Sequence, residues 1–281
     1  MQPSDWLPDK AQMRRSFEAA AAGYDAAAVL QKEVGGRLLE RLDLMKIQPS
    51  AILDLGAGTG QCIPGLFARY PRAQVIALDI AWSMVARARD RGRWLRRPRC
   101  VCGDAERLPF ASGRFDLVFS NLTLQWCNGL ETAFGELQRV LRPGGLLLFT
   151  TLGPDTLREL RHSWAAVDGY SHVNMFLDMH DVGDALVRAR FADPVMDVER
   201  LTLTYPDLKR LMRDLKRIGA HNVTAGRPRG LTGKSRMHRL TEAYESFRRD
   251  DLLPASYEVV HGHAWATSEE ISVPVETLRR R

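Results

Sequence analysis

The chain is poor in cysteine and has no long apolar run. Its four cysteines, among 281 residues, form no Cys-x-x-Cys pair and have no histidine beside them at metal-ligand spacing. We therefore expect no bound metal and no disulfide, with the cysteines serving as small core residues. No apolar run approaches the roughly 18–20 residues that a membrane helix requires, and residues 1–15 contain no apolar signal core. These features predict a cytoplasmic protein without membrane contact.

Basic residues outnumber acidic ones, at 40 against 34, for a net charge of +6. This balance favours acidic partners, although charge alone does not separate a nucleic acid from an acidic protein. The chain is 45% hydrophobic and 26% charged, which excludes a disordered or fibrous class. Its length allows one core domain with an elaboration.

A glycine-rich turn follows the first apolar run. Residues 51–60 have the sequence AILDLGAGTG, in which 51–54 predict the end of a buried strand and a helix is expected from Gln61 to Arg69. Gly56, Gly58 and Gly60 carry no Cβ, so a ligand can approach the backbone closely. The dinucleotide fingerprint requires a further glycine where this chain has Gln61. A nucleoside without phosphates therefore fits the turn better than a dinucleotide does.

Four further apolar runs end in polar residues or follow a glycine pair. Asp79 ends the second run, about 20 residues after the last glycine, where a carboxylate accepts hydrogen bonds from ribose hydroxyls. Residues 103–105 (Gly-Asp-Ala) follow the third run, and the carboxylate of Asp104 could accept a hydrogen bond from an adenine amino group. Asn121 follows the fourth run. A fifth run, 145–150, comes after Leu-Arg-Pro-Gly-Gly. The alternation of strands and helices over 51–150 predicts a parallel sheet with helices on both faces.

In this order, these motifs resemble the class I S-adenosylmethionine (SAM) methyltransferases. The resemblance implies an α/β, Rossmann-like sheet of seven mostly parallel strands with an antiparallel last strand, N-terminal lid helices and a helical insertion. It also implies SAM as cofactor. The residues expected to bind it are Asp54, Gly56, Gly58, Gly60, Asp79, Ile80, Asp104, Ala105, Asn121 and Gln125.

The chain divides into four parts by this interpretation. They are lid helices (1–48), the SAM-binding core (49–205), a basic helical insertion (206–253), and a closing strand with a tail (254–281). Within the insertion, helices are expected at Asp207–Ile218 and Ser235–Arg248, joined by a glycine-rich linker.

The second half resembles the malonyl-[acyl-carrier protein] O-methyltransferases of biotin synthesis, the BioC family. The resemblance is carried by residues 153–160 (GPDTLREL), 178–186 (DMHDVGDAL) and 257–265 (YEVVHGHAW), and by Tyr24-Asp25 ahead of the glycine turn. It implies that the free carboxyl group of a malonyl thioester, on acyl-carrier protein or coenzyme A, becomes a methyl ester.

A carboxylate is already ionised at pH 7, so this reaction needs alignment and water exclusion more than a general base. An arginine with a hydroxyl partner can orient a carboxylate through paired donors. We therefore predict Arg158 and Tyr24 as the residues that touch the acceptor. The alternatives are a solvated helix arginine and a packing tyrosine at a helix junction.

The insertion is rich in arginine and lysine, which suits docking of an acidic carrier protein rather than nucleic acid, because RNA binding would need exposed aromatic residues. A solvated helical hairpin is the alternative. Two other functions remain open: a methyltransferase for RNA or a small metabolite, and a SAM-binding assembly factor. The second is prompted by a similar Asp-Thr-Leu-x-Glu-Leu string in the mitochondrial complex I assembly factor that hydroxylates an arginine.

Overall fold

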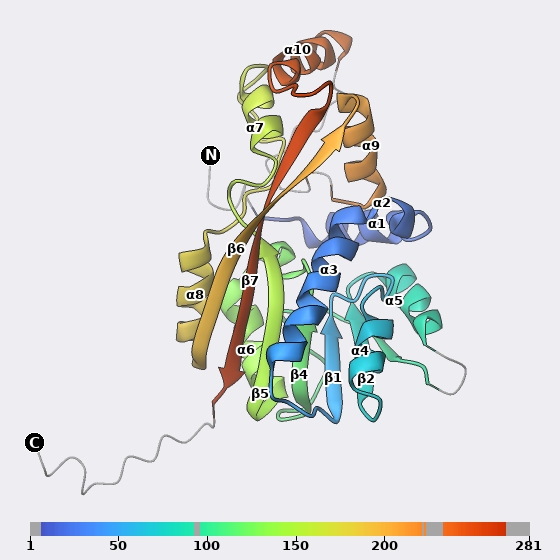
Figure 1. Cartoon of the computed structure of the whole chain (residues 1–281), viewed down its shortest axis with the longest axis vertical. Coiled ribbons are helices and arrows are strands. Elements are labelled where there is room, and N and C mark those ends of the chain that lie inside the picture. Colours follow the sequence, from blue (N-terminus) through green and yellow to red (C-terminus); the bar gives the residue numbers. More distant parts are fainter. Residues whose placement is uncertain (1–6, 93–95, 221, 223–232, 268–281) are drawn as a thin grey trace, which may run out of the picture.

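The computed structural model describes residues 7–92, 96–220, 222 and 233–267. Its seven strands form one sheet in the order β3-β2-β1-β4-β5-β7-β6 (Figure 1). Strands β1 to β5 pair in parallel, whereas β7 runs antiparallel to both of its neighbours. The expected fold class, a mostly parallel sheet closed by an antiparallel last strand, is confirmed.

The strands are Ala51–Leu55 (β1), Gln74–Asp79 (β2), Arg99–Cys102 (β3), Phe115–Ser120 (β4), Leu141–Leu152 (β5), Phe191–Tyr205 (β6) and Leu253–Ala266 (β7). The helices are Lys10–Ala20 (α1), Tyr24–Ala27 (α2), Val29–Arg41 (α3), Ile63–Arg69 (α4), Trp82–Ala88 (α5), Leu130–Val140 (α6), Arg158–Ala165 (α7), Met179–Arg188 (α8), Leu208–Arg217 (α9) and Lys234–Glu245 (α10). Short 3-10 turns are Leu42–Leu44 (η2), Arg89–Arg91 (η3) and Leu124–Trp126 (η4).

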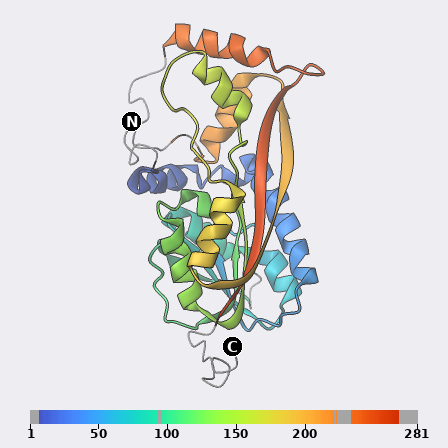
Figure 2. The same ribbon diagram turned by 90° about the vertical axis from the view of Figure 1, so that its left-hand side faces the viewer.

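Helices cover both faces of the sheet, as Figure 2 shows. Every residue of β1 is buried, and successive side chains of a strand enter opposite cores. Leu53 belongs to the core under α6 and α8, whereas Ile52 packs with α3 and α4. The two-sided burial explains why the parallel strands are continuous apolar runs.

The antiparallel pair β6–β7 extends beyond the other strands and carries a separate group of helices at its far end (Figure 1). We call α7, α9 and α10 the helical cap. Its apolar face includes Leu211 of α9, Tyr244 of α10 and Tyr257 of β7. These residues form a second apolar core, beyond the end of the parallel strands. Leu215 of α9 reaches from the cap to the cavity at that end of the sheet.

Several elements differ from expectation. The helix after the glycine turn begins at Ile63 rather than at the expected Gln61. Strand β6 begins at Phe191, and its register shifts before Val195 because Pro194 has no N–H for the ladder. Cys102 is exposed rather than in the core.

The glycine-rich linker and the tail of the expected scheme lie largely outside the described residues. Within the described part of the chain, no helix is long and apolar enough to cross a membrane.

Gly262 of β7 lies opposite Phe149 of β5, and a Cβ there would come within 2.3 Å of the phenyl ring. We expect Gly262→Ala to lower the free energy of unfolding by about 1–3 kcal/mol, because the buried ring must move. Urea denaturation measures this. As a control, Gly135→Ala in α6 meets no atom within 4 Å and should stabilise by about 0.5–1 kcal/mol. Equal midpoints for Gly262→Ala and wild type would refute the expectation.

Candidate functional site

A cavity opens at the carboxyl ends of β1, β2 and β4, under α1 and α2. We call it the central cavity; it contains about 1090 Å³ of space, part of it open to solvent. The expected cofactor residues that line it are Gly56, Gly58, Asp79, Ile80, Asp104, Ala105, Asn121 and Gln125. Tyr24 lines it as well. The structure therefore brings most of the predicted site together.

The glycine turn requires its glycines for two different reasons. Gly56 has a positive φ of 66°, and a Cβ there would overlap the side chain of Thr123 at 2.0 Å. Gly58 lies in the cavity wall, with the Tyr24 ring 3.9 Å from the position of a Cβ. Gly60 packs against Ile63 and Ala88 and does not line the central cavity, so the structure gives this glycine a packing role.

Two carboxylates lie at the ends of neighbouring strands. Asp79 accepts hydrogen bonds of 2.9 Å from the backbone N–H groups of Gly58 and Ala81. Asp54 is only 3% exposed, and its Oδ2 atom has no hydrogen-bond partner. It lies in a recess that shares Tyr24 and other residues with the central cavity.

Burial raises the pKa of Asp54 to about 7, with a further contribution from the charge of Asp79. Burial also raises the pKa of Asp79, to about 6, against the opposing effect of its backbone hydrogen bonds. A cation or a hydroxyl donor that enters here finds two desolvated acceptors.

Other polar residues of the wall are already bonded to the protein. Asp104 pairs with Lys10 of α1 at 2.5 Å. Asn121 donates from Nδ2 to the carbonyl of Gln31 at 2.9 Å, and its Oδ1 accepts from a threonine hydroxyl. Gln125 donates to the carbonyl of Leu122 at 2.7 Å. The two amides are therefore oriented by the fold before any ligand binds.

The helices α1 and α2 form a lid that is tied to separate loops of the cavity edge. Besides the Lys10–Asp104 pair, Glu18 accepts hydrogen bonds from the first two backbone N–H groups of α5, at 2.6 and 2.8 Å. Asp25 accepts from the Thr59 hydroxyl at 2.5 Å. These contacts hold the lid over the site.

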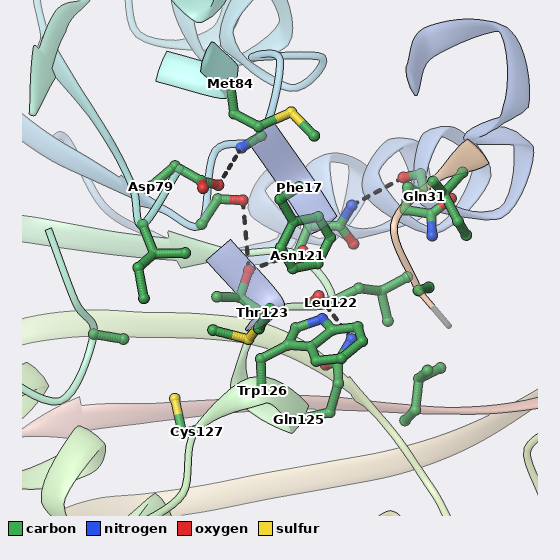
Figure 3. Close-up of a pocket in the computed structure, with 18 of the residues that line it drawn as sticks. Phe17, Gln31, Asp79, Met84, Asn121, Leu122, Thr123, Gln125, Trp126 and Cys127 are labelled. Atoms are coloured by element: carbon green, nitrogen blue, oxygen red, sulfur yellow. Dashed lines mark hydrogen bonds between the residues drawn. The ribbon is translucent and has the colours of Figure 1, made fainter. Parts of the chain in front are cut away.

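Sequence reasoning did not assign a site role to the aromatic wall. Phe17 of α1 and Trp126 of η4 meet edge to face in the cavity, with ring centroids 5.3 Å apart (Figure 3). Phe17 also packs against the small apolar cluster that includes Ala20 and Met84. Its contact with Trp126, more than a hundred positions later in the chain, left no sequence signal.

Arg158 does not lie in the central cavity. Leu157 has a left-handed φ of 53° and lines the cavity together with Thr156, whereas the next residue, Arg158, lies on the outer side of α7. Its side chain is 59% exposed and pairs with Glu159 at 3.3 Å. The structure therefore does not bring Arg158 together with Tyr24.

The residues present fit a nucleoside that also carries an ammonium group. Asp79 presents a carboxylate to the cavity, the kind of acceptor that suits ribose hydroxyls, and the unpartnered Oδ2 of Asp54 is a buried acceptor of the kind that suits an ammonium. Among the described residues that line the cavity, none is Lys, Arg or His. This acceptor-rich, otherwise apolar wall suits SAM, which carries a positive sulfur and an amino group.

Comparison with known proteins gives consistent results. Residues 53–149 match the family described as methyltransferase domain. The chain is 56% identical to the malonyl-[acyl-carrier protein] O-methyltransferase of Laribacter hongkongensis over 265 residues, covering 92% of this chain and 89% of that protein. It is 53% identical to the enzyme of the same name from Methylovorus sp. over 275 residues, covering 96% and 93%. Among solved structures, the YcgJ protein of Bacillus subtilis is similar in fold, with a TM-score of 0.58 at 18% identity, covering 83% of this chain and 99% of that chain.

The raised pKa values predict a pH-dependent affinity for SAM. Asp54 attracts an ammonium group, and Asp79 accepts from two hydroxyls, only when each is ionised, so protonation between about pH 7.5 and pH 5.5 should weaken binding, by up to about tenfold per unit for each proton taken up. Calorimetric titration measures the dissociation constant. Asp54→Asn should bind more weakly near pH 7.5 and show a flatter pH dependence, and Asp79→Ala should abolish binding.

The exposed Asp193 offers a control, because Asp193→Asn should leave both the affinity and its pH dependence unchanged. Unaltered SAM affinity in Asp79→Ala would refute the assignment of the ribose acceptor.

Proposed function

Because the chain belongs to the malonyl-[acyl-carrier protein] O-methyltransferase family, we propose that it methylates the free carboxyl group of a malonyl thioester, a step of biotin synthesis. SAM is the methyl donor. The observation that carries the proposal is the family relation over nearly the whole chain, joined to a cavity whose wall presents acceptors for SAM.

The proposed contacts to SAM use residues at the ends of successive strands. Asp79 would accept from the ribose hydroxyls, and Asp54 from the amino group. Asp104 and Ala105 would border the adenine, and Gly56 would allow close approach to the backbone. When bound, SAM supplies a methyl group on a positively charged sulfur.

The wall of the central cavity suits a reaction in which charge disappears. An anionic carboxylate that becomes a neutral ester loses its charge, so a place with little water favours the change. Phe17, Leu122 and Trp126 line the cavity with apolar surface. Their contribution is to exclude water and to hold the reacting groups in line.

Neutral hydroxyl groups, rather than cations, would orient the acceptor. Tyr24 and Tyr257 both line the cavity, and burial is the main cause that raises the pKa of each, so both stay protonated donors. A hydroxyl can orient a carboxylate without neutralising it as a paired arginine would. This favours Tyr24 as an acceptor-binding residue. A contact between Arg158 and the acceptor stays a prediction, and the exposed position of its side chain does not favour that contact.

The helical cap would dock the acidic carrier. All five basic residues of α9 are exposed, whereas its apolar face is buried. They are Lys209, Arg210, Arg213, Lys216 and Arg217, and they are opposed within the helix only by Asp214. Such a surface speeds encounter with an acidic protein. The insertion residues Arg227 and Arg229 lie outside the described residues.

A first test distinguishes this reaction from methylation of another acceptor and from an assembly role without methyl transfer. The cytoplasmic location also stays a prediction. Purified protein is mixed with SAM and malonyl-carrier protein, and the malonyl arm is analysed by mass spectrometry. We expect the mass gain of a methyl group in place of a proton. Bound SAM without any such gain would overturn the proposal.

A second prediction separates the two acceptor assignments. Tyr24→Phe should lower kcat/KM for the malonyl substrate about tenfold, the effect of one lost hydrogen bond of about 1.4 kcal/mol. SAM affinity should hardly change. Arg158→Ala is the matched comparison: an acceptor role predicts a similar loss, whereas its outward placement predicts less than about a twofold change. Full activity of Tyr24→Phe would remove Tyr24 from the mechanism.

A third prediction concerns docking. Reversing the charges of Arg210, Arg213 and Arg217 to Glu should raise KM for malonyl-carrier protein, because encounter with an acidic surface is weakened. KM for malonyl-CoA should be spared. A triple reversal of exposed arginines in the sheet half, Arg72, Arg87 and Arg89, controls for net charge. Equal effects on both acyl donors would contradict the assigned docking surface.

A further inference from the structure

A second hollow lies beside the central cavity and is not used by the contacts described so far. We call it the outer hollow. It contains about 950 Å³ of space, counting its open mouth. It is bounded by Pro154, by Arg161, Trp164 and Ala165 of α7, and by residues 168–173, 175 and 176.

The outer hollow adjoins the central cavity through one residue. Phe176 lines both. Around it the chain alternates, because Asn174 lines the central cavity whereas Val173 and Met175 line the outer hollow. On the other side Thr156 lines the cavity and Pro154 the hollow. Phe176 therefore lies at the boundary between the two spaces.

The wall of the outer hollow is preformed and of mixed polarity. Trp164 and His172 stack with ring centroids 3.6 Å apart and an interplanar angle of 7°. His172 Nε2 lies 2.8 Å from Asp168 Oδ1, and the buried Oδ2 of Asp168 has no hydrogen-bond partner. Tyr170 and Met175 expose more than half of their surface at the rim. Such a wall offers flat apolar contact beside a carboxylate whose Oδ2 atom has only Arg236 near it, at 3.8 Å.

One arginine, Arg161, borders the outer hollow, and a second, Arg236, pairs with a residue of its wall. Arg161 donates to the backbone carbonyls of Pro154 and Thr156, at 2.8 and 3.0 Å. In the part of the chain that the structure describes, Arg161 forms no ion pair, so no bonded carboxylate neutralises it. Arg236 of α10 reaches Asp168 at 3.8 Å. This contact joins the outer hollow to the basic helices of the cap.

The outer hollow therefore adjoins the central cavity at Phe176 and is joined to α10 of the cap by the Arg236–Asp168 contact. A malonyl group on a carrier hangs from a pantetheine arm, a flexible chain with amide groups that ends in a phosphate. We propose that the outer hollow binds this arm, with Arg161 toward its phosphate, Asp168 toward an amide, and Phe176 at the passage into the central cavity. This inference rests on the proposed function.

The test compares malonyl thioesters of different length with one blocking variant. Ala165 is exposed on α7 and borders the outer hollow, so Ala165→Trp should fill it without disturbing the core. We expect KM for malonyl-pantetheine and malonyl-carrier protein to rise about tenfold or more. The short mimic malonyl-N-acetylcysteamine, which reaches only the central cavity, should keep its kinetic constants. Ala68→Trp on the exposed face of α4 is the matched control and should change neither.

A second variant tests the charged end. Arg161→Gln should raise KM for malonyl-phosphopantetheine but not for malonyl-pantetheine, which lacks the phosphate, and unchanged SAM affinity shows that the fold is intact.

Equal effects of Ala165→Trp on long and short thioesters, or no effect on either, would overturn the arm site while leaving methyl transfer established. Failure of the wild-type protein to methylate any of these thioesters would instead overturn the proposed function itself.

Discussion

The parallel register of β1 with its two neighbours is the constraint on which the site depends. Leu55 pairs with Leu78 of β2 and with Ser120 of β4, so the three strands end at one edge. Asp79 and Asn121 follow those pairs directly and therefore reach the same cavity as the glycine turn. Thr123 then fills the space that a side chain at Gly56 would need. Backbone pairing sets these positions before any side-chain chemistry is considered.

The arrangement of the strand ends removes the carboxylates of Asp54 and Asp79 from water. The fold places Asp54 and Asp79 where burial raises both pKa values, which costs stability when they ionise. A cationic ligand recovers that cost, so the site is arranged for a positive group rather than for an anion. The lid adds to this by covering the edge with apolar surface from Phe17 while its charged residues bond to loops around the cavity.

The long antiparallel pair β6–β7 gives the molecule its second half. Because it extends past the sheet, it supports α9 and α10 at its far end (Figure 1). The inner end of α9 then lines the central cavity through Leu215, while its basic residues stay exposed. Both helices were predicted from the sequence, and in α9 the buried residues Leu208, Leu211 and Leu215 recur at helical spacing. The packing of α7 against α10, by contrast, joins segments that are distant in the chain.

The amino-acid sequence by itself determined the alternation of elements, the glycine turn and the acidic residue at the end of β2, because these depend on local periodicity and on residues near in the chain. Only the tertiary structure decided which side chains share the cavity. It brought Trp126 to Phe17, gave Asp104 the partner Lys10, and left Gly60 and Arg158 outside the cavity. The left-handed turn at Leu157 precedes Arg158, whereas the contacts of Phe17 and Lys10 depend on where α1 packs. Contacts between distant segments follow from how the elements pack, and no short pattern encodes them.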